Sequence, residues 1–263
     1  MRLAAVLAPV LLLGWPALAQ EAPQRAPFIT TPPEVVARML AMAHTGPEDF
    51  VIDLGSGDGR IVIHAAREHG ARGLGVDLDP ALVARSLDNA ARAGVADRVR
   101  FEVRDALRTD LSAASVVTIY LLPFLLDRLE PRLLNGMRPG ARIVTHAFAL
   151  ASWPYDRAET VRLSRPHEGQ GDASRIYLYI VPAQARGVWQ APGGWQLRVQ
   201  QSFQAIEVAA VRDARALPVN SARLDGERIF ISGTGFTFSG RVTPERISGE
   251  LAGGAPLVFE RAP

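Results

Sequence analysis

The fold of this 263-residue chain is decided by the stretch Phe50-Val51-Ile52-Asp53-Leu54-Gly55-Ser56-Gly57-Asp58-Gly59-Arg60. An apolar run enters a glycine turn there, and a helix-like segment from Ile61 to Glu68 follows at once. Glycine lets the backbone turn sharply and approach a ligand closely, and the N–H groups that begin the helix would point at that ligand. The stretch therefore predicts a strand, a ligand-binding turn and a helix in succession.

The spacing of the turn argues against a dinucleotide. A dinucleotide fingerprint needs its third glycine at position 60, where this chain has Arg60. Asp53 precedes the first glycine by two residues, and a carboxylate there would repel a pyrophosphate and attract an amine. S-adenosylmethionine carries an amine and a sulfonium but no phosphate, so the pattern favours this cofactor.

Two further acids follow at strand ends. The run from Arg72 to Asp77 reads as a second strand, and its last carboxylate lies 22 residues after Gly55, where ribose hydroxyls would bind. A third strand, Arg98 to Val103, is followed by Asp105. This order resembles the successive motifs of class I S-adenosylmethionine-dependent methyltransferases. The alternative is an ordinary strand–turn–helix unit with surface acids.

The resemblance implies a fold and a cofactor site. The fold would be α/β, with a doubly wound, Rossmann-like, seven-strand methyltransferase sheet. Asp53 and the glycine turn would hold the methionine part of the cofactor, Asp77 the ribose and Asp105 the adenine amine. The implied cofactor-binding residues are Asp53, Gly55, Ser56, Gly57, Gly59, Asp77, Asp105 and Ala106.

A closer resemblance rests on four segments, which are residues 28–36, Asp53 to Arg60, Tyr120-Leu121-Leu122-Pro123 and residues 139–148. They look like the mitochondrial protein-lysine methyltransferases and their bacterial relatives. The eukaryotic members act on the c-subunit of ATP synthase and on the adenine nucleotide translocase. The resemblance covers about residues 27–182 and departs at Thr30, where the family usually has proline. It implies a protein substrate that is methylated on a lysine side chain.

Patterns along residues 28–182 predict the rest of a methyltransferase domain. Thr31-Pro32-Pro33-Glu34 reads as a capping box at the start of a helix, and Asp79-Pro80 begins another helix that stops at Gly94. An apolar strand spans 115–120, a helix contains Leu125, Leu129 and Leu133, and a fifth strand spans 142–147. Strands over 159–163 and 175–181 would form a terminal hairpin, joined by a polar, flexible loop over 164–174 that we interpret as a lid.

From Gly187 onward the pattern is that of an antiparallel β domain, 187–263, for which no family resemblance is evident. Apolar and polar residues alternate, as in Trp195, Leu197 and Val199. We expect six or seven short strands in a small barrel or sheet, after a boundary at residues 182–187. Turn signals fall at Gly193-Gly194, Asp225-Gly226, Ser239-Gly240 and Gly253-Gly254.

Candidate catalytic residues follow the fourth strand. Tyr120 and Pro123 begin and end a run that resembles in position the proline-containing motif with which amine methyltransferases accept hydrogen bonds from the target nitrogen. The alternative is that Leu121, Leu122 and Leu125 simply begin a core helix. His146 would also face the ligand crevice, and we interpret it as a structural histidine rather than a base.

Composition excludes several functions. A formal net charge of +2 without a basic run gives no reason to expect nucleic-acid binding. The absence of cysteine excludes disulfides and thiolate metal sites, and His64 and His69 lie on different faces of one helix, so no metal is expected. The chain contains no lysine, so a lysine methyltransferase of this sequence could not methylate itself; codon preference explains this more simply.

The first 19 residues have the character of a secretory signal peptide. Arg2 is followed by an apolar run, and Ala17-Leu18-Ala19 precedes Gln20 as a cleavage signature. An uncleaved anchor facing the periplasm is the alternative. Residues 20–27 would be a short disordered lead, and the mature chain would be periplasmic, with an envelope or membrane protein as its expected partner.

Three functions remain open. The first is a protein-lysine methyltransferase, and the second is a small-molecule methyltransferase on the same cofactor core. The third is an exported binding protein that keeps the fold without catalysis, because S-adenosylmethionine is made in the cytoplasm. Asp53, Gly55, Gly57, Asp77 and Asp105 are all present, which argues for a working cofactor site.

Overall fold

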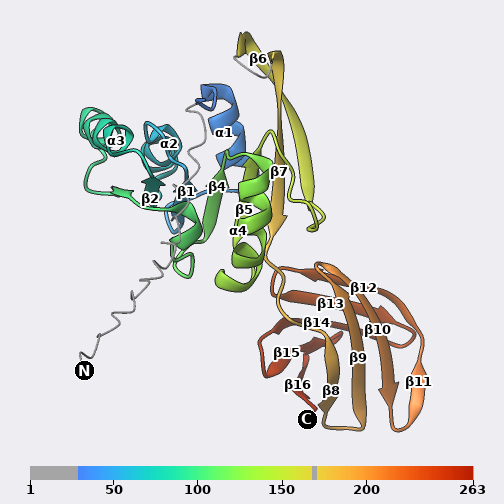
Figure 1. Cartoon of the computed structure of the whole chain (residues 1–263). Helices are drawn as coiled ribbons and strands as arrows, with labels where there is room; N and C mark the ends of the chain where they lie inside the picture. The colour runs from blue at the N-terminus through green and yellow to red at the C-terminus, as the bar shows by residue number, and fades with distance from the viewer. Residues whose placement is uncertain (1–28, 168–170, 263) are drawn as a thin grey trace, which may run out of the picture.

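The computed structural model describes residues 29–167 and 171–262, which form two sheets in succession (Figure 1). The first sheet has seven strands and the second nine, and each is packed on its own apolar core. The expected signal peptide over 1–19 and the lead over 20–27 lie outside the described residues. None of the described helices is both long and apolar enough to cross a membrane.

The first part mixes helices with strands. Its elements are α1 (Pro33–Met42), β1 (Phe50–Leu54), α2 (Arg60–His69), β2 (Arg72–Asp77), α3 (Pro80–Arg92), β3 (Val99–Val103), the short helix η1 (Ala106–Arg108), β4 (Val116–Ile119), α4 (Pro123–Gly136), β5 (Arg142–His146), β6 (Arg157–His167) and β7 (Gly171–Ile180).

The strand order of the first sheet is β3-β2-β1-β4-β5-β7-β6. The first five strands of the chain are parallel, and β7 pairs antiparallel with both β5 and β6. The order reverses between β1 and β4, so the crevice at their carboxyl ends is the expected ligand site. The doubly wound, seven-strand fold predicted from the sequence is confirmed.

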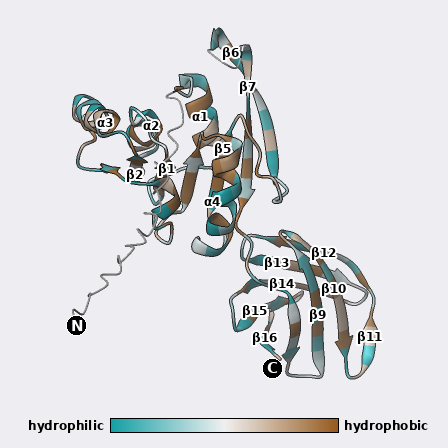
Figure 2. Cartoon of the chain, viewed as in Figure 1, coloured by the Kyte–Doolittle hydropathy of each residue, from teal (hydrophilic) through white to brown (hydrophobic). Residues whose placement is uncertain are grey.

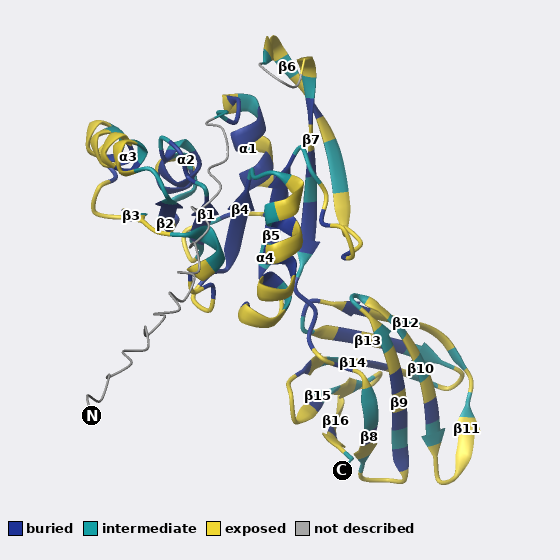
Figure 3. Ribbon diagram, viewed as in Figure 1, coloured by how far each residue is buried: buried dark blue, intermediate teal, exposed yellow. Residues whose placement is uncertain are grey.

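Helices cover both faces of this sheet. One face packs on α1 and α2 through residues such as Met39, Ile61 and Val116, while the other packs on α4 through residues such as Leu129 and Ile119. The central strand β4 is buried along its length and apolar except for Thr118, as Figures 2 and 3 show. A strand covered on both faces favours apolar side chains on both of its sides, which explains its mainly apolar sequence.

The second part is entirely antiparallel. Its strands are β8 (Gly187–Ala191), β9 (Trp195–Ser202), β10 (Ala205–Arg212), β11 (Arg215–Leu217), β12 (Val219–Asp225), β13 (Arg228–Gly233), β14 (Phe236–Val242), β15 (Arg246–Leu251) and β16 (Ala255–Arg261). Their order is β11-β10-β9-β8-β16-β15-β14-β13-β12, and β10 also contacts β12, so the sheet curls almost into a barrel. The aromatic side chains Trp189, Phe238 and Phe259 fill its core.

The β9–β10 hairpin tip joins the two parts. Phe203 adopts a left-handed backbone conformation with a φ of 52° and stacks on Trp153, with 5.6 Å between ring centroids. The neighbouring Gln204 side chain donates to the Ile180 carbonyl at 2.9 Å and accepts from the Gly226 amide at 3.2 Å. The C-terminal sheet is therefore packed onto the first part.

The structure corrects the predicted capping box. Helix α1 begins at Pro33 with Pro32 as its N-cap, and no side chain caps it. The Thr31 hydroxyl contacts His146 instead, and the Glu34 carboxylate accepts from Ser164. Thr31 and Glu34 have the spacing of a capping box, but both side chains bond to residues distant in the sequence and not to the backbone of α1.

Three strand predictions also need correction. The terminal hairpin is longer than expected, because β6 reaches His167 and β7 starts at Gly171, so most of the predicted loop is paired strand. Residues 168–170, the centre of the predicted lid, lie outside the described residues. Ser239-Gly240 lies within β14 rather than in a turn, and the second sheet has nine strands rather than six or seven.

Candidate active site

The glycine turn between β1 and α2 needs glycine at three positions. Gly55, Gly57 and Gly59 have φ values of 82°, 55° and 79°, which other residues rarely adopt. A Cβ on Gly55 would also lie 2.8 Å from a methyl carbon of Leu121. The turn thus brings the backbone after β1 against the segment after β4.

The N–H groups of the turn do not form an anion cradle. Gly55 and Ser56 both donate to the Val76 carbonyl at 2.9 Å, and Gly57 donates to the Asp77 carboxylate at 2.9 Å. Internal partners satisfy these amides, so they offer nothing to a pyrophosphate. The expectation that N–H groups face the ligand concerned the amides that begin α2, and for those it stays a prediction.

The Asp58 carboxylate disfavours the binding of an anion at the start of α2. Its carboxylate accepts from the Arg60 amide at 3.3 Å and pairs with the Arg60 guanidinium at 2.6 Å. The pairing with Arg60 and its hydrogen bonds hold the pKa of Asp58 below its usual range, although burial opposes this. An ionised carboxylate at a helix start repels phosphate, which supports the choice of cofactor made from the spacing.

Asp53 is the chemically distinctive residue of the site. Its side chain is 2% exposed and accepts a hydrogen bond from the Thr118 hydroxyl at 2.7 Å. Among the described residues no cation pairs with it. Burial raises the pKa of Asp53 to about 7, the Thr118 hydrogen bond lowers it, and the charges of Asp77 and Asp58 raise it. An unpaired buried carboxylate at a ligand-binding turn suits an ammonium group.

Asp77 and Asp105 are held by backbone amides. One Asp77 oxygen accepts from Gly57 and the other from Asp79, each at 2.9 Å, which fixes the plane of the carboxylate. Each oxygen keeps acceptor capacity for a ribose hydroxyl. Asp105 accepts from the Leu107 amide at 2.8 Å and caps η1, the short helix that begins at Ala106.

These features fit S-adenosylmethionine. Its ammonium would complete the buried charge of Asp53, its ribose would meet Asp77, and its adenine would lie towards Asp105. The structure gathers the predicted cofactor residues along the carboxyl ends of β1, β2 and β3. Their individual contacts with the cofactor stay predictions.

The predicted catalytic segment lies beside the turn. Tyr120 follows β4 and is half-buried, while Pro123 is exposed and opens α4. The Leu122 carbonyl accepts from the amides of Leu125 and Leu126, so it belongs to the helix. No described residue donates a hydrogen bond to the Leu121 carbonyl, so that oxygen has no partner within the described part of the chain. The catalytic roles of Tyr120 and Pro123 stay predictions.

His146 belongs to a buried chain of contacts. It is fully buried, its ring lies against Tyr120 with 4.1 Å between centroids, and its Nδ1 lies 3.1 Å from the Thr31 hydroxyl. The Thr31 carbonyl accepts from the guanidinium of Arg60 at 3.0 Å. These contacts connect the acceptor segment to the glycine turn through Arg60 and Asp58.

Sequence reasoning missed two residues here, Thr31 and Thr118. Thr118 could have been found, because it lies inside an otherwise apolar strand and pairs in register with Asp53. Thr31 could not have been found in this way, because its position before Pro32-Pro33-Glu34 predicted helix capping and not a contact with His146. Trp153 is 2% exposed and packs on Tyr179 and Phe203, so it belongs to the core.

Comparisons with known proteins agree with this site. A family model described as the ANTKMT methyltransferase domain matches residues 53–157. A protein-lysine N-methyltransferase of Saccharolobus islandicus is 33% identical over 156 residues, which is 59% of this chain and 93% of the relative. The adenine nucleotide translocase lysine N-methyltransferase of Mus musculus is 35% identical over 128 residues, 48% of this chain and 55% of the relative. The chain thus spans about half the length of this mammalian relative.

A solved structure of a methyltransferase has the same fold. The RNA methyltransferase from Salinibacter ruber, in complex with S-adenosyl-L-homocysteine, is 46% identical and superposes with a TM-score of 0.54 over 59% of this chain and 95% of that one. The fold, the cofactor residues and this neighbour define an S-adenosylmethionine-dependent methyltransferase. More particularly, the chain belongs to the family of protein-lysine N-methyltransferases that includes the Saccharolobus islandicus relative, which confirms the resemblance found in the sequence.

Proposed function

We propose that this protein transfers the methyl group of S-adenosylmethionine to the side-chain amine of a lysine in a protein substrate. The observation that carries the proposal is the state of His146. Its ring is fully buried against Tyr120, and its Nδ1 is engaged with Thr31. Full burial leaves no edge of this ring exposed to an incoming oxygen nucleophile, so His146 is not placed to act as its general base. An amine needs no such base, because its lone pair attacks directly once it is neutral.

The residues of the chain then have distinct tasks. When bound, the cofactor supplies a methyl group activated by the sulfonium. Asp53 would hold the ammonium of the cofactor, and Asp77 its ribose. The Leu121 carbonyl and Tyr120 would orient the substrate nitrogen, and the surrounding apolar residues would favour its neutral form, since burial disfavours an ammonium. Positioning and desolvation supply the catalysis.

The alternatives differ in substrate. The Salinibacter ruber neighbour is described as an RNA methyltransferase, which makes RNA a second candidate. The formal net charge of +2, with 29 basic and 27 acidic residues, gives little support for it. A small amine is the third candidate, and the relatives named as lysine N-methyltransferases favour protein over both.

A transfer assay with labelled cofactor tests the proposal. Lysine-containing peptides, envelope proteins, RNA and a small-molecule extract would be offered separately, and methylated lysine would be identified by mass spectrometry. The chain itself has no lysine, so methyl-lysine can come only from the substrate. Label on lysine that disappears in Asp53→Asn supports the proposal, and label confined to RNA or to small molecules overturns it.

We also propose that the mature protein acts outside the cytoplasm on an envelope or membrane protein. The support is the sequence of the first 19 residues, with Arg2, the apolar run and Ala17-Leu18-Ala19. The proposed division into a methyltransferase domain over 28–182 and a β domain over 187–263 follows the boundary between the two sheets, which falls after β7 ends at Ile180.

A further inference from the structure

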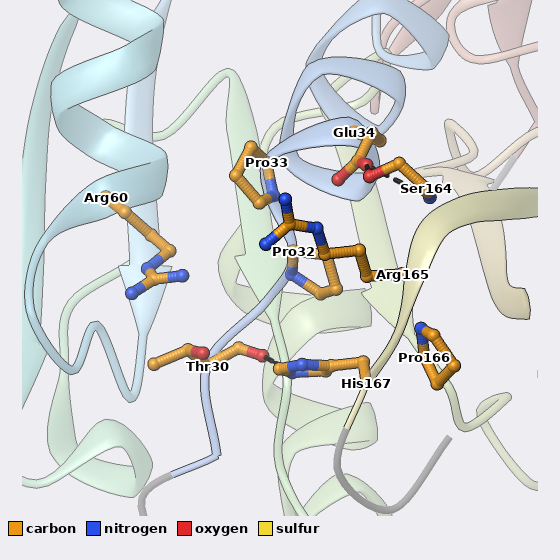
Figure 4. A pocket seen from close by; sticks show the side chains of 9 residues that line it. All are labelled: Thr30, Pro32, Pro33, Glu34, Arg60, Ser164, Arg165, Pro166 and His167. Atoms are coloured by element: carbon orange, nitrogen blue, oxygen red, sulfur yellow. Dashed lines mark hydrogen bonds between the residues drawn. The ribbon is translucent and has the colours of Figure 1, made fainter. Parts of the chain in front are cut away.

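A cavity of about 410 Å³ lies beside the proposed transfer site, between the starts of α1 and α2 and the outer half of β6 (Figure 4). We call it the Arg165 cavity. Three segments that are distant in sequence form its wall: Thr30, Pro32, Pro33 and Glu34; Arg60; and Ser164, Arg165, Pro166 and His167. Nothing in the cofactor site or in the acceptor segment uses this space.

Most charged groups of the Arg165 cavity already have partners. The Arg60 guanidinium pairs with Asp58 and donates to the Thr31 carbonyl. The Glu34 carboxylate accepts hydrogen bonds from the amide and the hydroxyl of Ser164, which hold its pKa below the usual range. Arg60 is therefore ion-paired, whereas Glu34 keeps its negative charge and is held in place by Ser164.

Arg165 is the exception. In the described part of the chain no carboxylate or carbonyl pairs with its guanidinium, which reaches into the cavity beside Pro32 and Pro33 (Figure 4). His167 at the floor contacts the Thr30 carbonyl. Among the described residues of the wall, Arg165 is therefore the charged group that has neither an ion pair nor a hydrogen bond, and its planar guanidinium can bind a carboxylate through two parallel hydrogen bonds.

Packed side chains link the wall of the cavity to the transfer site. Thr30 and Pro32 of its wall flank Thr31, which contacts His146, and the His146 ring lies against Tyr120. A substrate chain that presents its lysine at Tyr120 and continues past the start of α1 would bring a flanking residue to this cavity. We propose that the Arg165 cavity binds a carboxylate of the protein substrate that flanks the target lysine. This inference rests on the proposed function.

The charges present favour a carboxylate over a nucleic-acid phosphate. A nucleic-acid backbone carries several phosphates, and among the described residues of the wall only Arg165 lacks a partner and could receive one, while Glu34 would repel the others. A single guanidinium suits a single monoanion. The flanking acid would also offset the repulsion between a positively charged lysine and Arg165, so it would favour such substrates before transfer.

The test is an acid scan in lysine peptides. Glutamate, glutamine or arginine is placed in turn at each position on either side of one lysine, and kcat/KM is measured for the wild type, Arg165→Gln and Arg165→Glu. At one or a few positions the wild type should prefer glutamate by about tenfold, mostly through KM, as a charge-assisted hydrogen bond predicts. Arg165→Gln should lose that preference, and Arg165→Glu should prefer arginine at the same position.

Arg162→Gln is the matched control, because Arg162 is an exposed arginine of the same strand that does not line the cavity. It should keep the glutamate preference. A preference that survives in Arg165→Gln, or that is lost equally in Arg162→Gln, overturns the inference. Binding of peptides with norleucine in place of lysine, measured by fluorescence anisotropy, should show the same pattern without turnover.

The assays distinguish a failure of the carboxylate site from a failure of the proposed lysine methylation. If the wild type methylates lysine peptides regardless of flanking charge, the proposed function stands and the carboxylate site is wrong. If no lysine peptide is methylated while RNA accepts the label, the proposed function is wrong and this inference is overturned with it. Cofactor affinity, which should be unchanged in every Arg165 and Arg162 variant, shows that each protein is folded.

Discussion

Cofactor affinity should depend on pH through Asp53. This carboxyl is 2% exposed and has only the Thr118 hydroxyl as a neutral hydrogen-bond donor, and burial raises its pKa to about 7 in the free protein. The cofactor ammonium pairs with the ionised carboxylate, so binding requires the proton to leave. The folded-state pKa lies above the ordinary value, hence the ionised fraction, and with it the affinity, rises as the pH rises towards 7.

The magnitude follows from the ionised fraction. With a pKa of about 7, roughly 3% of Asp53 is ionised at pH 5.5 and about half at pH 7, so the affinity should rise roughly fifteenfold over this range. Binding near pH 6 should release close to one proton. The range ends at pH 7 because an α-amino group begins to lose its own proton above about pH 7.5.

Isothermal titration calorimetry can measure both quantities, with each pH studied in two buffers of different ionisation enthalpy. Asp53→Asn should bind more weakly and lose the pH dependence. Thr118→Val keeps the shape of the side chain but removes the hydrogen bond that lowers the Asp53 pKa, so the rise in affinity should move to higher pH. A wild-type affinity that stays flat between pH 5.5 and 7, or an equal slope in Asp53→Asn, would refute the reasoning.

Other changes test the packing, the domain boundary, the chemistry and the export. Phe203→Ala should lower the free energy of unfolding by about 2 kcal/mol, because a half-buried ring stacked on Trp153 is lost, whereas the more peripheral Phe230→Ala should change it by less than half as much in denaturant titrations. A chain ending at Pro182 should keep most of its cofactor affinity but melt at a lower temperature, and a folded chain that fails to bind would show that the β domain completes the site. His146→Ala should leave kcat within about tenfold, since no base is needed, and a loss of about 100-fold or more at saturating cofactor would point to an oxygen nucleophile. Mass spectrometry of the native protein should find a first residue near Gln20, and an intact Met1 in a cytoplasmic pool would contradict the expected export.

The sequence determined the parts of this protein that depend on neighbouring residues. Three glycines after an apolar strand leave few conformations for the backbone, so the turn at Gly55 to Gly59 could be predicted together with its strand and helix. The acids at the ends of β2 and β3 follow the strand pattern in the same way. Because parallel strands place their carboxyl ends on one edge, the order of these motifs predicted the cofactor site before any distance was known.

Tertiary structure decided the features that depend on residues far apart. Thr31 has the local pattern of a capping residue, yet it contacts His146, 115 residues later, because the chain entering α1 passes over the end of β5. Nothing in the sequence around Phe203 indicates that its ring stacks on Trp153, 50 residues earlier in the chain. The raised pKa of Asp53 exists only because the folded sheet removes water from a carboxyl that has no cation beside it. Burial, and contacts between distant segments, are properties of the whole fold, so no local pattern could have specified them.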